Sequence, residues 1–156
     1  ARNTPTLLQV YMAYFGLGAL GIHISSYAAV LGAITFNNAG YLTEIFRGGL
    51  AAVPRQQLAA ARSLGMSNVQ GFLHVVFPQV FRIIFFAFVT QAVWAMLNTS
   101  LGMLVGLREL AGEANYAQSL SFRTFEFFLV TALIYYLLAK AIELGSRFVF
   151  WRVFKA

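Results

Sequence analysis

This chain of 156 residues contains no cysteine, three prolines and only five acidic residues. The absence of cysteine excludes disulfide bonds, thiol nucleophiles and cysteine-ligated metal centres. Charged residues are also scarce, at 10% of the chain, whereas soluble domains carry about 25%. Hydrophobic residues make up 60% of the sequence. This composition indicates an integral membrane protein.

Signatures of catalysis are missing as well. No G-x-x-x-x-G-K-[ST] phosphate-binding loop occurs in the sequence, so the chain lacks that motif for binding ATP. Neither His23 nor His74 has an acidic or histidine neighbour at the spacing of metal ligands. No paired aspartates, His-Glu motif or Ser-Lys pair lies at a plausible membrane depth. We therefore predict no catalytic residue, no metal site and no enzyme activity.

Four apolar stretches predict an all-α fold, an integral membrane bundle of about four transmembrane helices. A membrane-spanning helix needs about 20 mainly apolar residues. We expect the spans at about residues 5–20, 25–46, 79–107 and 125–150. The first is the shortest of the four. We treat residues 1–156 as a single transmembrane domain.

The distribution of basic residues predicts how the chain is oriented. Arginines gather between the second and third spans, and the tail is also basic. These residues are Arg47, Arg55, Arg62 and Arg82, followed in the tail by Lys140, Arg147, Arg152 and Lys155. Because lysine and arginine mark cytoplasmic loops, we expect residues 47–82 and the C-terminus on the cytoplasmic side. Membrane topology thus accounts for the net charge of +6, and we predict no nucleic-acid partner.

Residues 54–78 interrupt the apolar pattern with what reads as two short helices. Pro54 suits the first turn of a helix, and Gly65 follows as a left-handed stop. Ser67 and Gln70 then form a Ser-x-x-Gln capping box that begins a second helix. Pro78, at the end of this segment, is expected to start the next span.

Each short helix of this hairpin carries one apolar stripe at helical spacing. The stripes are Leu58, Ala61 and Leu64 on the first helix, and Val69, Phe72, Leu73, Val76 and Phe77 on the second. The pattern alone is compatible with a hairpin lying on the lipid headgroups or docking on another protein. The run of alanines at 59–61 favours docking, because small side chains let another surface approach closely.

The hairpin resembles the EAA loop of ABC importer permeases, which reads E-A-A-x3-G-x9-I-x-L-P. Here the corresponding residues are Ala59-Ala60-Ala61, Gly65 and Val75-Val76-Phe77-Pro78. Further segments resemble motifs of the permeases for polar amino acids, of the histidine and glutamine type. They are RNTPTLLQVYMAYFGL, YLTEIFRGGLAAVPRQQ, LNTSL and RTFEFFLVTALIY. The resemblance extends over nearly the whole chain, in order.

This resemblance implies a type I importer permease fold, in which the EAA-like segment is a cytoplasmic coupling helix. The coupling residues it implies are Ala59, Ala60, Ala61, Arg62, Gly65, Val75, Phe77 and Pro78. The implied partners are a cytoplasmic ATPase dimer that binds ATP and Mg²⁺, a second permease subunit and a periplasmic or lipid-tethered solute-binding protein. The implied location is a bacterial inner membrane. The alternative is a secondary transporter or channel fragment without an ATPase, which would require charged residues at mid-span.

Three departures from the family pattern stand out. Ala59 replaces the motif glutamate, and Arg55 or Arg62 is a candidate to replace its interactions. Leu97 and Asn98 replace the lysine and aspartate of K-D-T-S-L, which removes two charges from a region expected to face substrate. Family members usually have five spans, so the resemblance implies that the first is missing from these residues.

Polar residues inside the spans mark the expected substrate path, since such groups usually face a bundle interior or a water-filled cavity. The candidates are Gln91, Asn98, Thr99, Ser100 and Glu109. We expect residues 98–100, followed by Gly102, to break the helix and offer free N–H groups to a substrate carboxylate.

Two other sets of polar residues have a second interpretation. We expect Asn37 and Asn38 to hydrogen-bond to neighbouring helices rather than to substrate. Glu109 is suited either to receive a substrate ammonium group or to pair with Arg108 or Arg123. Glu44 and Arg47 are expected to form a surface ion pair.

Overall fold

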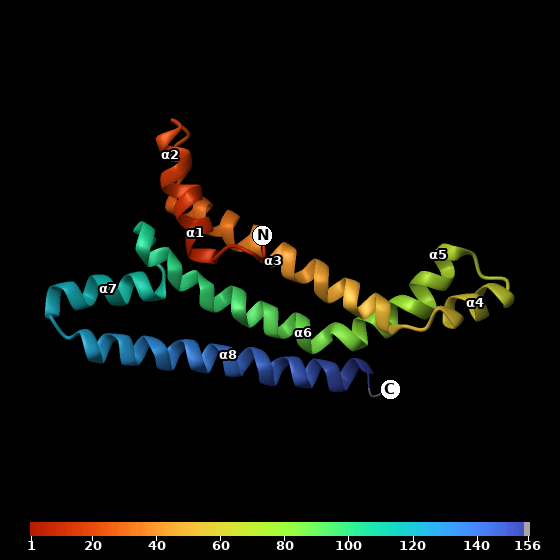
Figure 1. Cartoon of the computed structure of the whole chain (residues 1–156). Helices are drawn as coiled ribbons and strands as arrows, with labels where there is room; N and C mark the ends of the chain where they lie inside the picture. Colours follow the sequence, from red (N-terminus) through yellow and green to blue (C-terminus); the bar gives the residue numbers. More distant parts are fainter. Residues whose placement is uncertain (155–156) are drawn as a thin grey trace.

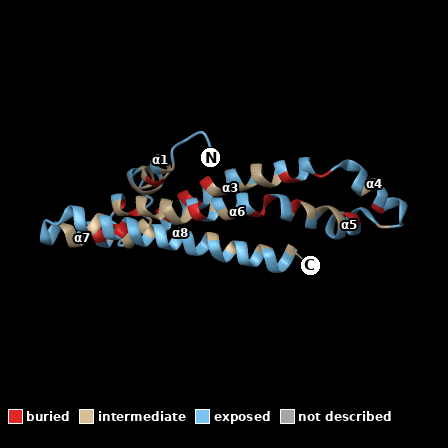
Figure 2. Ribbon diagram, turned by 90° about the horizontal axis from the view of Figure 1, so that it is seen from below, coloured by how far each residue is buried: buried red, intermediate tan, exposed pale blue. Residues whose placement is uncertain are grey.

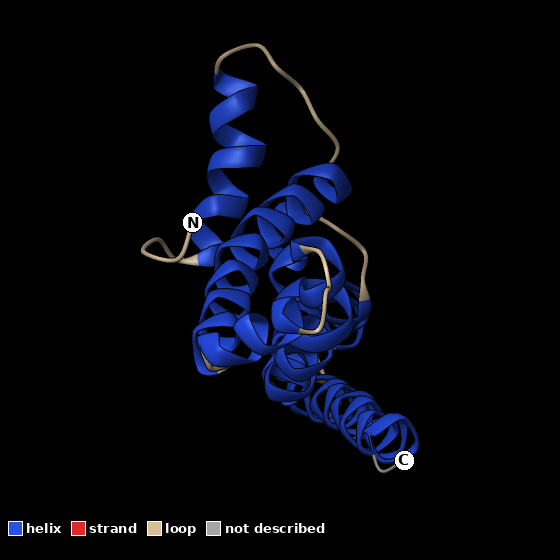
Figure 3. Cartoon of the chain, turned by 90° about the vertical axis from the view of Figure 1, so that its right-hand side faces the viewer, coloured by secondary structure: helices blue, strands red, loops and turns tan. Residues whose placement is uncertain are grey.

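The computed structural model describes residues 1–154, and all regular secondary structure in that range is helical (Figures 1 and 3). Lys155, part of the predicted basic tail, lies outside the described residues. The elements are α1 (Thr6–Tyr11), the π-helical turn η1 (Met12–Gly16), α2 (Leu17–Ala19), α3 (Ser26–Ala52), α4 (Arg55–Ser63), α5 (Asn68–Gly71), the π-helical turn η2 (Phe72–Val76), α6 (Phe77–Asn98), the 3₁₀ helix η3 (Thr99–Val105), α7 (Leu110–Ser121) and α8 (Thr124–Phe154).

Three long helices, α3, α6 and α8, run alongside one another and form the body of the molecule (Figure 1). Helices α3 and α6 run in opposite directions and pack closely where Gly49 meets Val80 and Ile84. A Cβ atom at Gly49 would lie 3.1 Å from Val80 Cγ1 and would collide with the Ile84 side chain. Glycine therefore sets the closest approach of the two helices, as small residues do between helices in lipid.

A second buried cluster holds the N-terminal helices against this body. Val10 is completely buried against α3 and η3, where its neighbours are Val30, Ala33, Ile34 and Val105. Figure 1 shows α1 and α2 projecting away from the long helices beyond this contact. The buried residues follow the contacts between helices, while most of α8 is exposed (Figure 2). An apolar helix with an exposed surface of this kind is typical of a protein whose solvent is lipid.

Two of the expected spans have the length and apolar character needed to cross a membrane. They are the continuous helix Asn68–Val105, of 38 residues, and Thr124–Phe154, of 31 residues. Helix α3 has 27 residues, but Asn37, Asn38, Glu44 and Arg47 reduce its apolar character. It also extends six residues beyond the expected end at Phe46. The first expected span forms only the short helical run Thr6–Ala19.

Phenylalanines join the C-terminal end of α8 to the first half of α6. Phe150 lies 5.3 Å from Phe85 and 4.7 Å from Phe86, measured between ring centroids. Phe154 extends the cluster to Phe81 at 6.0 Å. Such aromatic pairs contribute about 0.5–1.5 kcal/mol beyond the burial of their area. The cluster therefore fixes the end of α8 beside the beginning of α6.

Helix α7 returns along the first half of α8 instead of forming an extended loop (Figure 1). Gly106, at φ +74°, turns the chain after η3. Phe122, at φ +59°, makes the second turn between α7 and α8. A positive φ is uncommon for a residue other than glycine. These two turns bring Glu109, at the start of α7, beside Tyr135 in α8.

Candidate functional site

The hairpin at 54–78 has the local features that the sequence predicts. Pro54 precedes α4, whose first helical residue is Arg55. Gly65 has φ +84°, a conformation in which side chains other than glycine are strained. The Ser67 hydroxyl accepts a hydrogen bond from the Gln70 N–H, and the Gln70 side chain accepts one from the Ser67 N–H at 2.9 Å. The bend and the capping box are therefore confirmed.

The two arms of the hairpin are held together by a close contact and a hydrogen bond. A Cβ atom at Gly71 would lie 2.9 Å from Leu58 Cδ1 and 3.4 Å from Ala61 Cβ. Arg62 Nε donates to Asn68 Oδ1 at 2.7 Å, which ties the end of α4 to the start of α5. Arg62 thus stabilises the hairpin by joining its two arms. In this chain Ala59 stands in place of the motif glutamate.

The exposure of the hairpin shows which residues of the predicted apolar stripes and of the alanine run face outward. Leu64 is 81% exposed and lies one residue beyond the end of α4, in the turn that leads to Gly65. Ala61 is buried inside the hairpin, whereas Ala59 and Ala60 are exposed. Only the last two are therefore free to meet another surface. On the second arm Val75 is partly buried and Phe77 is exposed.

Pro78 lies in the first turn of α6, as expected, but α6 does not begin as a separate helix. The chain is helical without a break from Asn68 to Val105, and Pro78 lies at the start of α6 directly after the π-turn η2. Proline removes a backbone donor and crowds the preceding turn. The wider π-turn, in which the Phe77 N–H donates to the Phe72 carbonyl, lies within this preceding turn. The second arm of the hairpin and the third expected span are consequently one helix.

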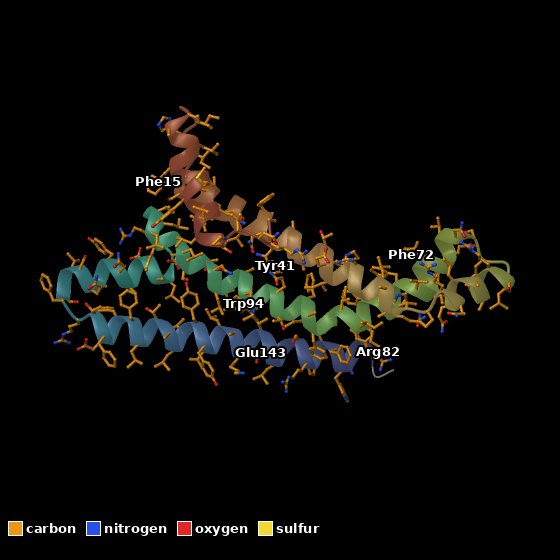
Figure 4. The ribbon with its side chains drawn as sticks, in the orientation of Figure 1. Phe15, Tyr41, Phe72, Arg82, Trp94 and Glu143 are labelled. Carbon is orange, nitrogen blue, oxygen red and sulfur yellow. The ribbon has the colours of Figure 1, made fainter. Side chains whose placement is uncertain are left out.

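A cavity of about 300 Å³ lies between the start of α1, α3 and α6. Its lining consists of polar and aromatic residues, namely Thr6, Asn37, Tyr41, Gln91, Trp94 and Asn98. Figure 4 marks Tyr41 on α3 and Trp94 on α6, well away from Phe72 in the hairpin. The cavity is at the small end of the range for small-molecule pockets. It brings together two of the predicted substrate-path residues, Gln91 and Asn98.

Asn38 and Gln91 form a direct hydrogen bond between α3 and α6. Gln91 Nε2 donates to Asn38 Oδ1 at 2.7 Å, and Asn38 Nδ2 donates to the Ile34 carbonyl at 2.9 Å. The expectation of a bond to a neighbouring helix is confirmed for Asn38. Asn37 behaves differently: it is 5% exposed and lines the cavity. Sequence reasoning placed Asn37 with Asn38, because adjacent residues of the same type give no signal of which one faces a cavity.

Thr99 and Ser100 lie away from this cavity. Their hydroxyls donate to the backbone carbonyls of Met96 at 2.6 Å and Leu97 at 2.7 Å. The expected helix break is wrong, because residues 99–105 continue as a 3₁₀ helix and the chain turns only at Gly106. Gly102 is instead a packing position, where a Cβ would lie 2.8 Å from Leu107 Cδ2.

The carboxylate of Glu109 accepts three hydrogen bonds from groups of this chain. Its carboxylate accepts hydrogen bonds from the backbone N–H of Ala111 at 2.9 Å and of Gly112 at 2.7 Å, and so caps α7. Tyr135 Oη donates to the same carboxylate at 2.7 Å. Glu109 forms no ion pair with Arg108, which pairs with Glu113 instead at 2.7 Å. This bond to the Glu113 carboxylate raises the pKa of Arg108 above its usual value.

Two pairs complete the description of the charged groups near the ends of the helices. Glu44 pairs with Arg47 as expected, and also with Arg2 at 3.7 Å. Lys140 pairs with Glu143 at 2.8 Å on α8. These side chains are partly or largely exposed, and such exposed pairs contribute at most about 1 kcal/mol each.

A family model described as binding-protein-dependent transport system inner membrane component matches residues 1–154. The chain belongs to this family. Among its curated relatives are three bacterial permease proteins. They are the octopine transport system permease protein OccM of Rhizobium meliloti, 36% identical over 86% of this chain and 58% of its own length; the probable amino-acid ABC transporter permease protein PatM of Vibrio harveyi, 32% identical over 86% and 62%; and the probable glutamine ABC transporter permease protein GlnP of Bacillus subtilis, 33% identical over 94% and 68%.

The chain thus spans less than two thirds of the length of the first two of these inner membrane components. A solved structure described as an amino acid ABC transporter with histidines is 30% identical and has a TM-score of 0.88. That similarity covers 97% of this chain and 71% of the solved chain. The ABC permease fold that the sequence resemblance implies is therefore confirmed.

Proposed function

We propose that this chain is the membrane-spanning subunit of an ATP-driven importer that carries polar amino acids across a bacterial inner membrane. Its family, and relatives whose names refer to amino-acid, glutamine and octopine permeases, support this function. In this proposal ATP and Mg²⁺ bind to a cytoplasmic ATPase dimer. A second permease subunit completes the path, and a periplasmic or lipid-tethered binding protein delivers the amino acid.

The observation that carries the proposal is the single helix from Asn68 to Val105. Its first residues form one arm of the exposed hairpin, and Gln91, Trp94 and Asn98 further along it line the polar cavity. A displacement of the hairpin is therefore transmitted to the cavity wall through one continuous helix. This is the connection that an importer needs between its ATPase and its substrate path.

The orientation is part of the same proposal. With residues 47–82 and the C-terminus in the cytoplasm, the hairpin faces the ATPase and the α7 turn faces the binding protein. The exposed surface of the hairpin includes the apolar side chains of Leu64, Val69 and Leu73. Exposed apolar groups beside arginine are typical of protein interfaces, in which arginine is enriched and lysine is depleted.

Two substitutions at Gly65 test the docking role. A Cβ at this glycine meets no atom within 4 Å, so the chain itself has room for a side chain there. Valine strongly resists the positive φ of this position, whereas asparagine tolerates it better than most residues. We expect Gly65→Val to abolish copurification with the cognate ATPase and Gly65→Asn to retain part of it, while both proteins insert into the membrane.

The outcome separates the conformation of the bend from its contacts. Equal loss in both variants would place the partner directly against residue 65, and would still support docking. If the valine variant instead binds the ATPase and sustains uptake like the parent, the hairpin is not the coupling surface and the proposed function fails.

A further inference from the structure

Asn38 and Gln91 form a hydrogen bond whose direction is fixed by the chain, and Gln91 also lines the cavity between α1, α3 and α6. Asn38 donates to the Ile34 carbonyl, and a carbonyl can only accept, so the Asn38 oxygen is left to face Gln91. Gln91 must then use its NH₂ group to donate to that oxygen. Its own oxygen Oε1 receives no hydrogen bond within the described chain.

The amide of Asn98 is oriented like that of Gln91, with its NH₂ group used within the chain. Its Nδ2 donates to the Trp94 carbonyl at 2.8 Å, and its oxygen Oδ1 accepts from no donor among the described residues. Two cavity-lining amides, on α6, therefore present acceptor oxygens. An ammonium or amide NH₂ group of a ligand is the complementary donor.

Asn37, on α3, offers a hydrogen-bond donor to the cavity, where Gln91 and Asn98 offer acceptors. Its side chain is 5% exposed, lines the cavity and forms no hydrogen bond with another group in the described chain. Its amide atoms are not among the fully enclosed polar atoms without a partner in the described residues, so the amide is open to the cavity and can bind a ligand there. Its NH₂ group is free to donate to a carboxylate.

None of the six residues that line the cavity carries a charge at neutral pH. The acid nearest in sequence on α3, Glu44, is already paired with Arg2 and Arg47. A ligand with a net charge would enter this site without a counter-ion, at a cost of several kcal/mol in a membrane interior. A zwitterion brings its own opposite charges and avoids most of that cost.

We propose that Asn37 contacts the transported substrate directly, and that the cavity selects a polar amino acid with no net charge. This inference rests on the proposed transport function and narrows its substrate class. Asn37 binds the α-carboxylate, and the oxygens of Gln91 and Asn98 accept from the ammonium group or from a side-chain amide. Arginine and glutamate, which share the same backbone groups but carry a net charge, are disfavoured.

Trp94 offers a direct reading of the cavity, since the chain has only two tryptophans and Trp94 is the one that lines it. The test uses the full chain in lipid nanodiscs, with Trp151→Phe as the background, and follows Trp94 fluorescence. L-glutamine, L-glutamate and L-arginine are titrated separately. We expect L-glutamine to bind tightest, by about tenfold over the other two.

Substitutions at residue 37 then distinguish contact from packing. Asn37→Leu should weaken L-glutamine binding about tenfold, the loss of one hydrogen bond to a charged group. Asn37→Asp keeps the shape and adds a negative charge, and should reverse the preference so that L-arginine binds more tightly than L-glutamine. Asn115→Leu, on exposed α7, is the matched control and should bind L-glutamine as the parent does. Circular dichroism confirms that each variant is folded.

Three results overturn the inference. They are a parent that shows no response to any of the three amino acids, a parent that binds L-arginine or L-glutamate as tightly as L-glutamine, and an Asn37→Asp variant whose preference is unchanged. None of these titrations uses an ATPase. Their failure therefore leaves the copurification test of the Gly65 variants standing, and the two proposals are overturned separately.

Discussion

Gly71 lies directly against Ala61 in the hairpin, so that a Cβ at residue 71 would be 3.4 Å from the alanine methyl group. This contact between residues ten apart sets the spacing of the two arms. Leu58 closes the same contact from one turn earlier, 2.9 Å from that Cβ position. The surface proposed to meet the ATPase therefore depends on a glycine that faces inward and touches no partner.

Enlarging residue 71 should weaken ATPase binding without touching the interface. Gly71→Leu overpacks the hairpin, at a cost of about 1–3 kcal/mol, and should reduce affinity for the ATPase about tenfold or more. Gly71→Ala is the matched control, because only the flexible end of Leu58 must move to admit one methyl group. The measurement is the dissociation constant of the ATPase from nanodisc-embedded protein. Equal affinities for the leucine variant and the parent would contradict the role of this contact.

The bond between Asn38 and Gln91 should contribute measurably to the stability of the helix pair. Hydrogen bonds between membrane helices contribute about 0.6 kcal/mol on average and about 1.7 kcal/mol at most. A double-mutant cycle of Asn38→Ala and Gln91→Ala, read by reversible unfolding in bicelles, should give a coupling energy in that range. Purely additive effects would show that the two amides stabilise the fold independently.

Glu109 should act as a helix cap and not as a substrate contact. Glu109→Ala removes the acceptors of two backbone N–H groups and should lower the free energy of unfolding by about 0.5–2 kcal/mol. Tyr135→Phe removes only its hydrogen bond to that carboxylate and should cost less. In both variants, the amino-acid concentration that half-stimulates ATP hydrolysis should stay unchanged. A large rise with the fold intact would restore Glu109 to the substrate path.

The proposed orientation can be read by cysteine labelling, because the natural chain has no cysteine. Leu64, 81% exposed, lies at the hairpin, and Leu120, 68% exposed, lies near the far end of α7. A membrane-impermeant maleimide added to spheroplasts should label Leu120→Cys and leave Leu64→Cys unmodified. Inside-out vesicles should give the reverse. Labelling of both sites from the same side would contradict the assigned topology.

Features governed by nearby residues were predictable from the sequence. The left-handed bend at Gly65 and the reciprocal bonds of Ser67 and Gln70 depend on a few adjacent positions. The apolar content of the chain likewise predicts a membrane protein and the order of its long helices. The resemblance of the hairpin to the EAA loop extended this local information to a family and a fold.

Features that depend on distant contacts were not predictable from local pattern. The polar residues at 98–100 suggested an open helix end, but the hydroxyls of Thr99 and Ser100 bond to their own backbone and the turn falls at Gly106. Leu64 fits a helical spacing whose helix has already ended. The separate roles of Asn37 and Asn38 depend on which side of α3 meets α6. The side of α3 that meets α6 depends on packing such as that around Gly49. The identity of the two asparagines does not indicate it.

The contact of Gly49 with Ile84 also has a mechanical consequence. At a rise of 1.5 Å per residue, Ile84 lies about 18 Å from Phe72 and about 15 Å from Trp94 along the helix. If α6 tilts about the contact of Gly49 with Ile84, the helix acts as a lever whose two arms are similar in length. A movement of the hairpin end is then reproduced at Trp94 in the opposite direction, reduced by about one sixth because the second arm is the shorter.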